Sequence, residues 1–235
     1  MLIQLLSPLA SAALQVGLAA LPLAPPPPPI VELERVLEDP SLFFGRPVRT
    51  YVQVHSEVGE WNAYMLRFGP AAYRALSVWS DQQKLWDRAD YGAPMGRLFL
   101  PRQRPTALGR ARSQERFLCT VVVRDWFAGQ PWIEVQSAIR TRRQLPAGAL
   151  LAAIRAGELA DRGAFGMALG EFDRALAAGL PRPAEESLAE AREACAALQG
   201  GSGRPVEALV RNPARKRARD QAPDRAKDQQ RDGQR

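Results

Sequence analysis

The chain has 235 residues, of which 46% are hydrophobic and 24% are charged, and its formal net charge is +7. This length allows a small β domain and a small helical domain between an apolar start and a polar tail. One histidine and two cysteines without CxxC spacing argue against a zinc site, so we expect no metal and no cofactor.

The positive charge is unevenly distributed along the chain. Residues 211–235 carry nine Lys or Arg against four Asp, and residues 31–145 carry seventeen basic against twelve acidic side chains. Residues 146–203 are mildly acidic, with five basic against eight acidic side chains. Nucleic acid, other polyanions and an anionic membrane are therefore admissible partners of the basic parts, and an ordinary solvated surface is the alternative.

Residues 1–24 are predicted to be a signal peptide or a membrane anchor. Residues 1–31 contain no charged side chain, and residues 2–24 form an almost unbroken apolar run that could span a bilayer. Small residues such as Ala10 and Ala12 offer cleavage sites, although the usual positive start is missing. We therefore expect an exported protein of the periplasm or cell envelope, with contact to the membrane if the segment is retained. A hydrophobic leader without either role is the alternative.

Residues 25–37 are predicted to be a proline-rich linker with a short helix. Residues 25–29 are all proline and favour polyproline II, which makes a stiff spacer. The apolar residues of 30–38 fit a short helix that ends at Asp39-Pro40.

Residues 38–145 are predicted to form a β domain. Strands are expected at 48–58, 61–68 and 73–79, and a helix at 81–88 with Asp81 as its N-cap and Leu85 and Trp86 facing inward. The basic, proline-rich stretch 91–116 fits a long loop in which residues 98–100 pair briefly as an extra strand.

A β-hairpin is expected to close this domain. Residues 117–125 and 131–140 are rich in Val, Ile and aromatic residues and are joined by a turn-forming segment. Strict alternation in the second strand would place Ile133, Val135 and Ile139 on one buried face.

The β domain resembles the OB-fold barrels of exported bacterial proteins. The resemblance covers about residues 38–145 and depends on FFGRPVRTYVQV at the start and GQPWIEVQSAI at the end. It implies a five-stranded OB-like barrel. An SH3-like barrel would give almost the same strand count.

Residues 146–200 are predicted to be helical, because the apolar spacing changes after Pro146. The segment GELADRGAFGMALGEFDRALAAGLP resembles a single tetratricopeptide repeat, without the early tryptophan of that family, and residues 184–198 would cap it. The resemblance implies a concave face that receives a peptide or another subunit. It also implies that the following residues pack the helical pair: Ala156, Leu159, Gly163, Phe165, Ala168, Phe172 and Ala175.

Residues 201–235 are predicted to be a disordered basic tail, since they contain almost no aliphatic residue larger than alanine after the first few positions. The run ARKRAR at 214–219 fits either a solvated tail or a polyanion contact.

Candidate functional residues are sparse, and none forms a recognised catalytic motif. His55 on the first expected strand fits a structural histidine better than a general base. The aromatic residues Tyr51, Trp61, Tyr64, Trp79, Trp126 and Trp132 could stack on bases. Polyanion binding is predicted for the arginines of the basic loop: Arg97, Arg102, Arg104, Arg110, Arg112 and Arg116.

The sequence therefore predicts an α+β protein in which a five-stranded OB-like barrel precedes a tetratricopeptide-like helical hairpin with a capping helix. We expect a non-catalytic, exported interaction or scaffold protein with a protein partner. Single-stranded nucleic acid or polyanion binding by the barrel and its basic loop is the alternative, and a hydrolase-like activity at His55 is a third.

Overall fold

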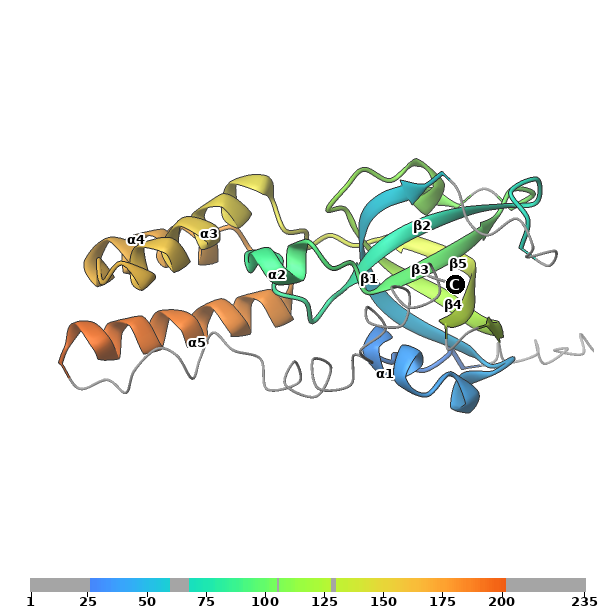
Figure 1. The fold of residues 1–235 in the computed structure, drawn as a ribbon, viewed down its shortest axis with the longest axis horizontal. Helices are drawn as coiled ribbons and strands as arrows, with labels where there is room; N and C mark the ends of the chain where they lie inside the picture. The colour runs from blue at the N-terminus through green and yellow to red at the C-terminus, as the bar shows by residue number, and fades with distance from the viewer. Residues whose placement is uncertain (1–25, 60–67, 105, 128–129, 202–235) are drawn as a thin grey trace, which may run out of the picture.

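A closed five-stranded barrel is followed by three helices in the computed structural model of the chain, which describes residues 26–59, 68–104, 106–127 and 130–201 (Figure 1). The barrel and the helices lie at opposite ends of the molecule, and the short helix α2 (Arg88–Tyr91) lies between them (Figure 1). The predicted α+β class is therefore confirmed, with a β part first and a helical part second.

The barrel consists of β1 (Pro47–Val58), β2 (Tyr73–Ser80), β3 (Gly96–Pro101), β4 (Arg116–Phe127) and β5 (Gln130–Arg140). Its strands are hydrogen-bonded in the order β1-β2-β3-β5-β4, and β4 pairs with β1 to close the cylinder. All neighbours are antiparallel except β3 and β5, which run parallel through Leu98 and Phe99. This arrangement is compatible with an OB-like barrel.

The hairpin predicted at the end of the β domain is confirmed as β4 and β5, but the predicted position of Ile139 is wrong. Ile133 and Val135 are fully buried, whereas Ile139 is 67% exposed. The register advances from Thr120 opposite Ser137 to Val121 opposite Val135, so β5 carries one extra residue, Gln136. Such a β-bulge reverses which face the later side chains occupy, and Ala138 takes the inward position instead.

The interior of the barrel is filled by aliphatic side chains from all five strands, and α1 (Leu33–Glu38) covers one end of it. Leu33 and Val36 are 1% and 0% exposed and pack into the same cluster as Val48 and Val52 of β1. The short helix expected before Asp39-Pro40 is thus confirmed, and it packs into the barrel core although it was expected in a linker.

Between β1 and β4, the sequence predicted a strand at 61–68 and a helix at 81–88. The strand expected at 61–68 lies outside the described residues except for Phe68, and the third barrel strand is instead β3, which confirms the extra strand expected at 98–100. The helix predicted at 81–88 is wrong, because residues 81–87 form turns in which side chains accept from the backbone: Gln82 N donates to Ser80 Oγ at 3.2 Å, and Lys84 N donates to Asp90 Oδ2 at 3.1 Å. Gln83 Oε1 accepts from Ser80 N at 3.0 Å, and Asp87 caps α2 by accepting from Ala89 N at 2.8 Å.

The helical part begins immediately after Pro146 and contains α3 (Ala147–Asp161), α4 (Phe165–Leu176) and α5 (Arg182–Gln199). Gly163 has φ +76° in the turn between α3 and α4, a conformation that favours glycine. Within the described ranges, none of the helices is long and apolar enough to cross a membrane.

The barrel and the helices share a hydrophobic cluster. Trp79 at the end of β2 and Leu85 in the following turn are 0% and 1% exposed, and they belong to the same buried cluster as Leu145, Leu150 and Leu188. Leu85 and Trp86 were expected to face inward, and they do so against the helical part. The helical part is therefore packed against the barrel through the segment that follows β2.

Candidate functional site

The aromatic side chains predicted to stack on bases do not form a common exposed face. Trp79 and Trp132 are 0% and 6% exposed, and Tyr51 lies beneath the guanidinium group of Arg116, 4.1 Å from its centre. Trp61 and Tyr64 lie outside the described residues. Of the predicted aromatic residues that the structure describes, Trp126 alone is more than one third exposed, and its ring makes an edge contact with Phe44.

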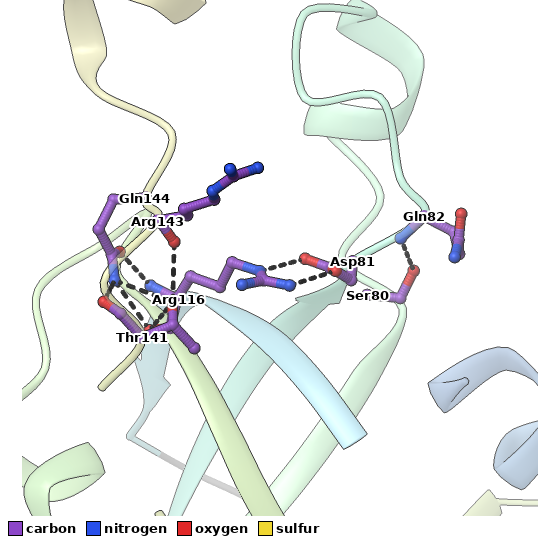
Figure 2. Close-up of polar contacts among 7 residues, drawn as sticks. All are labelled: Ser80, Asp81, Gln82, Arg116, Thr141, Arg143 and Gln144. Atoms are coloured by element: carbon purple, nitrogen blue, oxygen red, sulfur yellow. Dashed lines mark hydrogen bonds and ion pairs between the residues drawn. The ribbon is translucent and has the colours of Figure 1, made fainter. Parts of the chain in front are cut away.

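Arg116 was predicted to bind polyanions, but its charge is used inside the protein. Its Nε and Nη2 donate to the two carboxylate oxygens of Asp81 at 2.6 and 2.7 Å, and both side chains are about nine-tenths buried (Figure 2). The bidentate carboxylate partner neutralises this guanidinium group and occupies two of its donor groups, so little of its charge is available to a polyanion. We therefore remove Arg116 from the candidate polyanion surface.

The backbone of Arg116 also fixes the segment that leads into the helices. Gln144 accepts from Arg116 N at 2.6 Å through Oε1 and donates to Arg116 O at 3.1 Å through Nε2. Thr141 N donates to the same carbonyl oxygen at 3.0 Å, and Thr141 Oγ1 donates to Arg143 O at 2.8 Å (Figure 2). This network holds residues 141–144 against the start of β4 and so positions α3.

The other five predicted arginines are exposed, and four of them lie on one surface. Arg97 is at the start of β3, whereas Arg102, Arg104, Arg110 and Arg112 follow that strand in the connection to β4. The latter four line two adjoining hollows of the barrel surface, together with Arg74 and Arg140, which sequence analysis did not identify. The structure thus keeps four of the six predicted arginines on one surface.

The residues expected to pack the helical hairpin differ in how deeply they are buried. Ala156, Ala168 and Ala175 are 0% exposed and Phe172 is 4% exposed, so α3 and α4 approach closely through alanine with one large ring between them. Leu159 and Phe165 are partly buried at the edge of the same cluster. Gly163 forms the turn.

A groove of about 350 Å³ lies along the helical part, and we call it the helical groove. One wall is α3 and the other is α5, while the segment 84–88 that follows β2 closes the end toward the barrel. Its surface is mainly apolar and is lined by Trp86, Ala153, Ile154, Gly157, Phe172, Ala191, Ala194, Cys195 and Leu198, among others.

The α5 wall of the helical groove contains two small polar residues, Ser187 and Cys195. Ser187 Oγ is buried and has no hydrogen-bond partner within the part of the chain that the structure describes. Cys195 Sγ donates to Phe165 O at 3.7 Å, and burial raises the pKa of this thiol. An unsatisfied buried hydroxyl is unfavourable unless a ligand supplies its partner.

Charges of both signs lie around the helical groove. Lys84 and Arg88 lie on the barrel side, and Glu158 and Asp161 lie on α3. An extended or helical peptide has backbone and side-chain groups that can match such a rim while its apolar side chains enter the groove.

His55 contacts a serine and a tryptophan, and the two cysteines are buried. His55 Nδ1 lies 2.8 Å from Ser56 Oγ, and the ring makes an edge contact with the buried Trp79. Cys119 is 0% exposed, and burial raises its pKa to about 12, which confirms the expectation of a small buried residue. No group of three or more metal-ligating side chains occurs among the residues placed in the structure.

Comparisons with protein-family models, with curated proteins and with solved structures gave no match. The function is therefore argued from the geometry of this chain.

Proposed function

We propose that the protein is a non-catalytic interaction protein whose helical groove binds an extended or helical segment of a partner protein. The observation that carries this proposal is the apolar groove of about 350 Å³ between α3 and α5, where the buried Ser187 Oγ has no hydrogen-bond partner among the described residues. Hollows of this size accommodate a few side chains of a ligand and are typical of binding sites.

The partner segment should carry one or two aliphatic or aromatic side chains flanked by charges of both signs. The small residues Gly157, Ala153 and Ala194 leave room for such side chains between the helices. Lys84 and Arg88 would pair with acidic flanking residues of the partner, and Glu158 and Asp161 with basic ones.

The proposal includes an OB-like topology for the barrel and a tetratricopeptide-like arrangement for the helices. The strand order with one parallel pair favours an OB-like barrel over an SH3-like one. The alanine contacts between α3 and α4, followed by α5, favour a tetratricopeptide-like unit in which α3 and α5 form the concave face. A unit with one repeat has to bury its surface elsewhere, and here the barrel supplies part of that contact through Trp79 and Leu85.

Filling the groove from within is expected to abolish peptide binding without loss of stability. A side chain at Gly157 would meet no atom within 4 Å of its Cβ, so Gly157→Leu fits the fold and occupies the groove. Peptides selected on the full-length protein from a random 12-residue display library should bind this variant at least about tenfold more weakly by calorimetry. The melting temperature should be unchanged or higher, because leucine favours a helix by about 1 kcal/mol over glycine.

Gly170→Leu is the matched control for this experiment. Gly170 is also helical and also has open space around its Cβ, but it does not line the groove. Selected peptides that bind Gly157→Leu as tightly as they bind Gly170→Leu would exclude the helical groove as the binding site.

Export to the periplasm or cell envelope is part of the same proposal and is supported by the apolar composition of residues 2–24. When the full-length gene is expressed in a bacterium, we expect the protein in the envelope fraction, with a mass lower by that of about 24 residues if the segment is cleaved. Recovery of the intact chain from the cytosol alone would contradict export.

A further inference from the structure

A second hollow, on the barrel, is lined by four arginines and is independent of the helical groove. We call it the arginine pocket, and its volume is about 180 Å³. Arg74 comes from β2, and the remaining wall comes from the end of β3 and the connection after it. The residues that line it are Arg74, Leu100, Pro101, Arg102, Arg104, Thr106, Gly109 and Arg110.

Arg74 is fixed in place by three hydrogen bonds. Its Nε and Nη2 donate to the carboxylate of Glu57 at 2.8 and 2.6 Å, and its Nη1 donates to Gly109 O at 2.6 Å. A Cβ at position 109 would lie 3.3 Å from Arg74 Nη1, so glycine permits this close approach. Arg74 therefore holds the connection against the barrel, and Glu57 balances its charge.

The other three arginines of the pocket form no close ion pair of this kind, although the Glu57 carboxylate also interacts electrostatically with Arg102. Arg102 donates from Nε to the carbonyl oxygen of Pro70 at 2.8 Å, which orients its guanidinium group without neutralising it. Arg102, Arg104 and Arg110 form no ion pair with any residue in the described ranges. Three like charges around a hollow of this size repel one another unless an anion lies between them.

Thr106 is a further polar residue that lines the pocket. Its Oγ1 is buried and has no partner among the residues that the structure describes, although the side chain lines the hollow. A hydroxyl group donates readily to an oxyanion, and arginine forks match the geometry of phosphate oxygens. Both features favour a tetrahedral oxyanion as the ligand.

The positive surface continues beyond the pocket. Arg110 also lines an adjoining open trough of about 530 Å³ together with Arg112 and Arg140, and Glu115 pairs with Arg140 at 2.9 Å. The one aromatic residue that lines this trough, Phe117, is 1% exposed. Among the described residues that line it, this surface therefore offers charge along a path but no exposed ring on which a base could stack.

We propose that the arginine pocket binds a phosphate group of a linear phosphorylated polyanion, with the trough holding the neighbouring phosphates. Recognition depends on the charge and geometry of the phosphates rather than on bases. The ligand class is therefore an inorganic or non-nucleotide polyphosphate chain.

Calorimetry on the full-length protein tests this proposal with three probes: inorganic phosphate, a polyphosphate of about 15 units, and oligo-dT of equal phosphate number. We expect polyphosphate to bind most tightly and free phosphate most weakly. The double variant Arg104→Ala/Arg110→Ala should weaken polyphosphate binding about tenfold to a hundredfold. It should also reduce the slope of log K against log salt by about 2.

Two further variants separate a built pocket from general basicity. Thr106→Val should weaken polyphosphate binding about threefold to tenfold without changing the salt slope, since it removes a neutral donor. Arg97→Ala removes an exposed arginine outside the pocket and should have little effect. Equal losses for Arg97→Ala and the double variant would overturn the proposal, and so would tighter binding of oligo-dT than of polyphosphate.

Discussion

Replacing Arg116 with methionine is expected to lower the free energy of unfolding by about 3–5 kcal/mol. The substitution keeps the volume of the side chain but leaves the carboxylate of Asp81 buried without its bidentate partner. It also removes the guanidinium group that covers the ring of Tyr51. Denaturant unfolding of the full-length protein, followed by tryptophan fluorescence, measures the difference.

Two comparisons separate the buried pair from ordinary surface charge. Arg143→Met breaks an exposed ion pair with Glu185 and should change stability by less than about 0.5 kcal/mol. The double variant Arg116→Met/Asp81→Leu replaces both charges with apolar groups and should recover most of the loss. If Arg116→Met were no more destabilising than Arg143→Met, Arg116 would not be the structural residue inferred here.

The architecture was largely predictable because its signals are local. The hairpin carries β-branched residues on both sides of a turn, and the apolar spacing changes at Pro146. The exposure of the Ile139 side chain was not predictable in this way. It depends on one extra residue in β5, which alternation within a single strand does not reveal.

The arginines show a second limit of sequence reasoning. Arg112 and Arg116 are four residues apart in the same basic stretch, yet one is exposed and the other is buried against Asp81. The difference arises from strand pairing, because β4 begins at Arg116 beside β1 and the chain after β2 passes over it. Composition could therefore identify a basic surface but not its members.

The helical groove was implied by a family likeness, but its lining was not predictable. Its walls come from α3, α5 and the segment 84–88, which are far apart in the sequence. A helix was predicted at 81–88, whereas residues 81–87 form turns and α2 begins at Arg88, and both Trp86 and Arg88 line the groove. Ser187 carries no sequence signal, since a serine on a helix is usually exposed.

The aromatic residues on the outside of the barrel could either stabilise the fold or stack on bases. Phe99 lies between Leu98 and Leu100, which face the barrel interior, so its ring is on the outer face of β3. There it stacks on Trp132 with ring centres 4.5 Å apart and planes within 14°, and it contacts Phe68 at 5.1 Å. These rings cover the outside of the sheet as a second small core.

Phe99→Ala is accordingly expected to lower the free energy of unfolding by about 3–5 kcal/mol, because it opens a cavity among three packed rings. Trp126→Ala removes a larger ring that is 50% exposed and should cost less than about 1.5 kcal/mol. Denaturant unfolding measures both changes in the free energy of unfolding. Binding of oligo-dT by the two folded variants tests whether the rings stack on bases. A stable Phe99→Ala protein that had lost affinity for oligo-dT would show that this cluster is a base-stacking surface, whereas a destabilised protein with unchanged affinity assigns the rings to the fold.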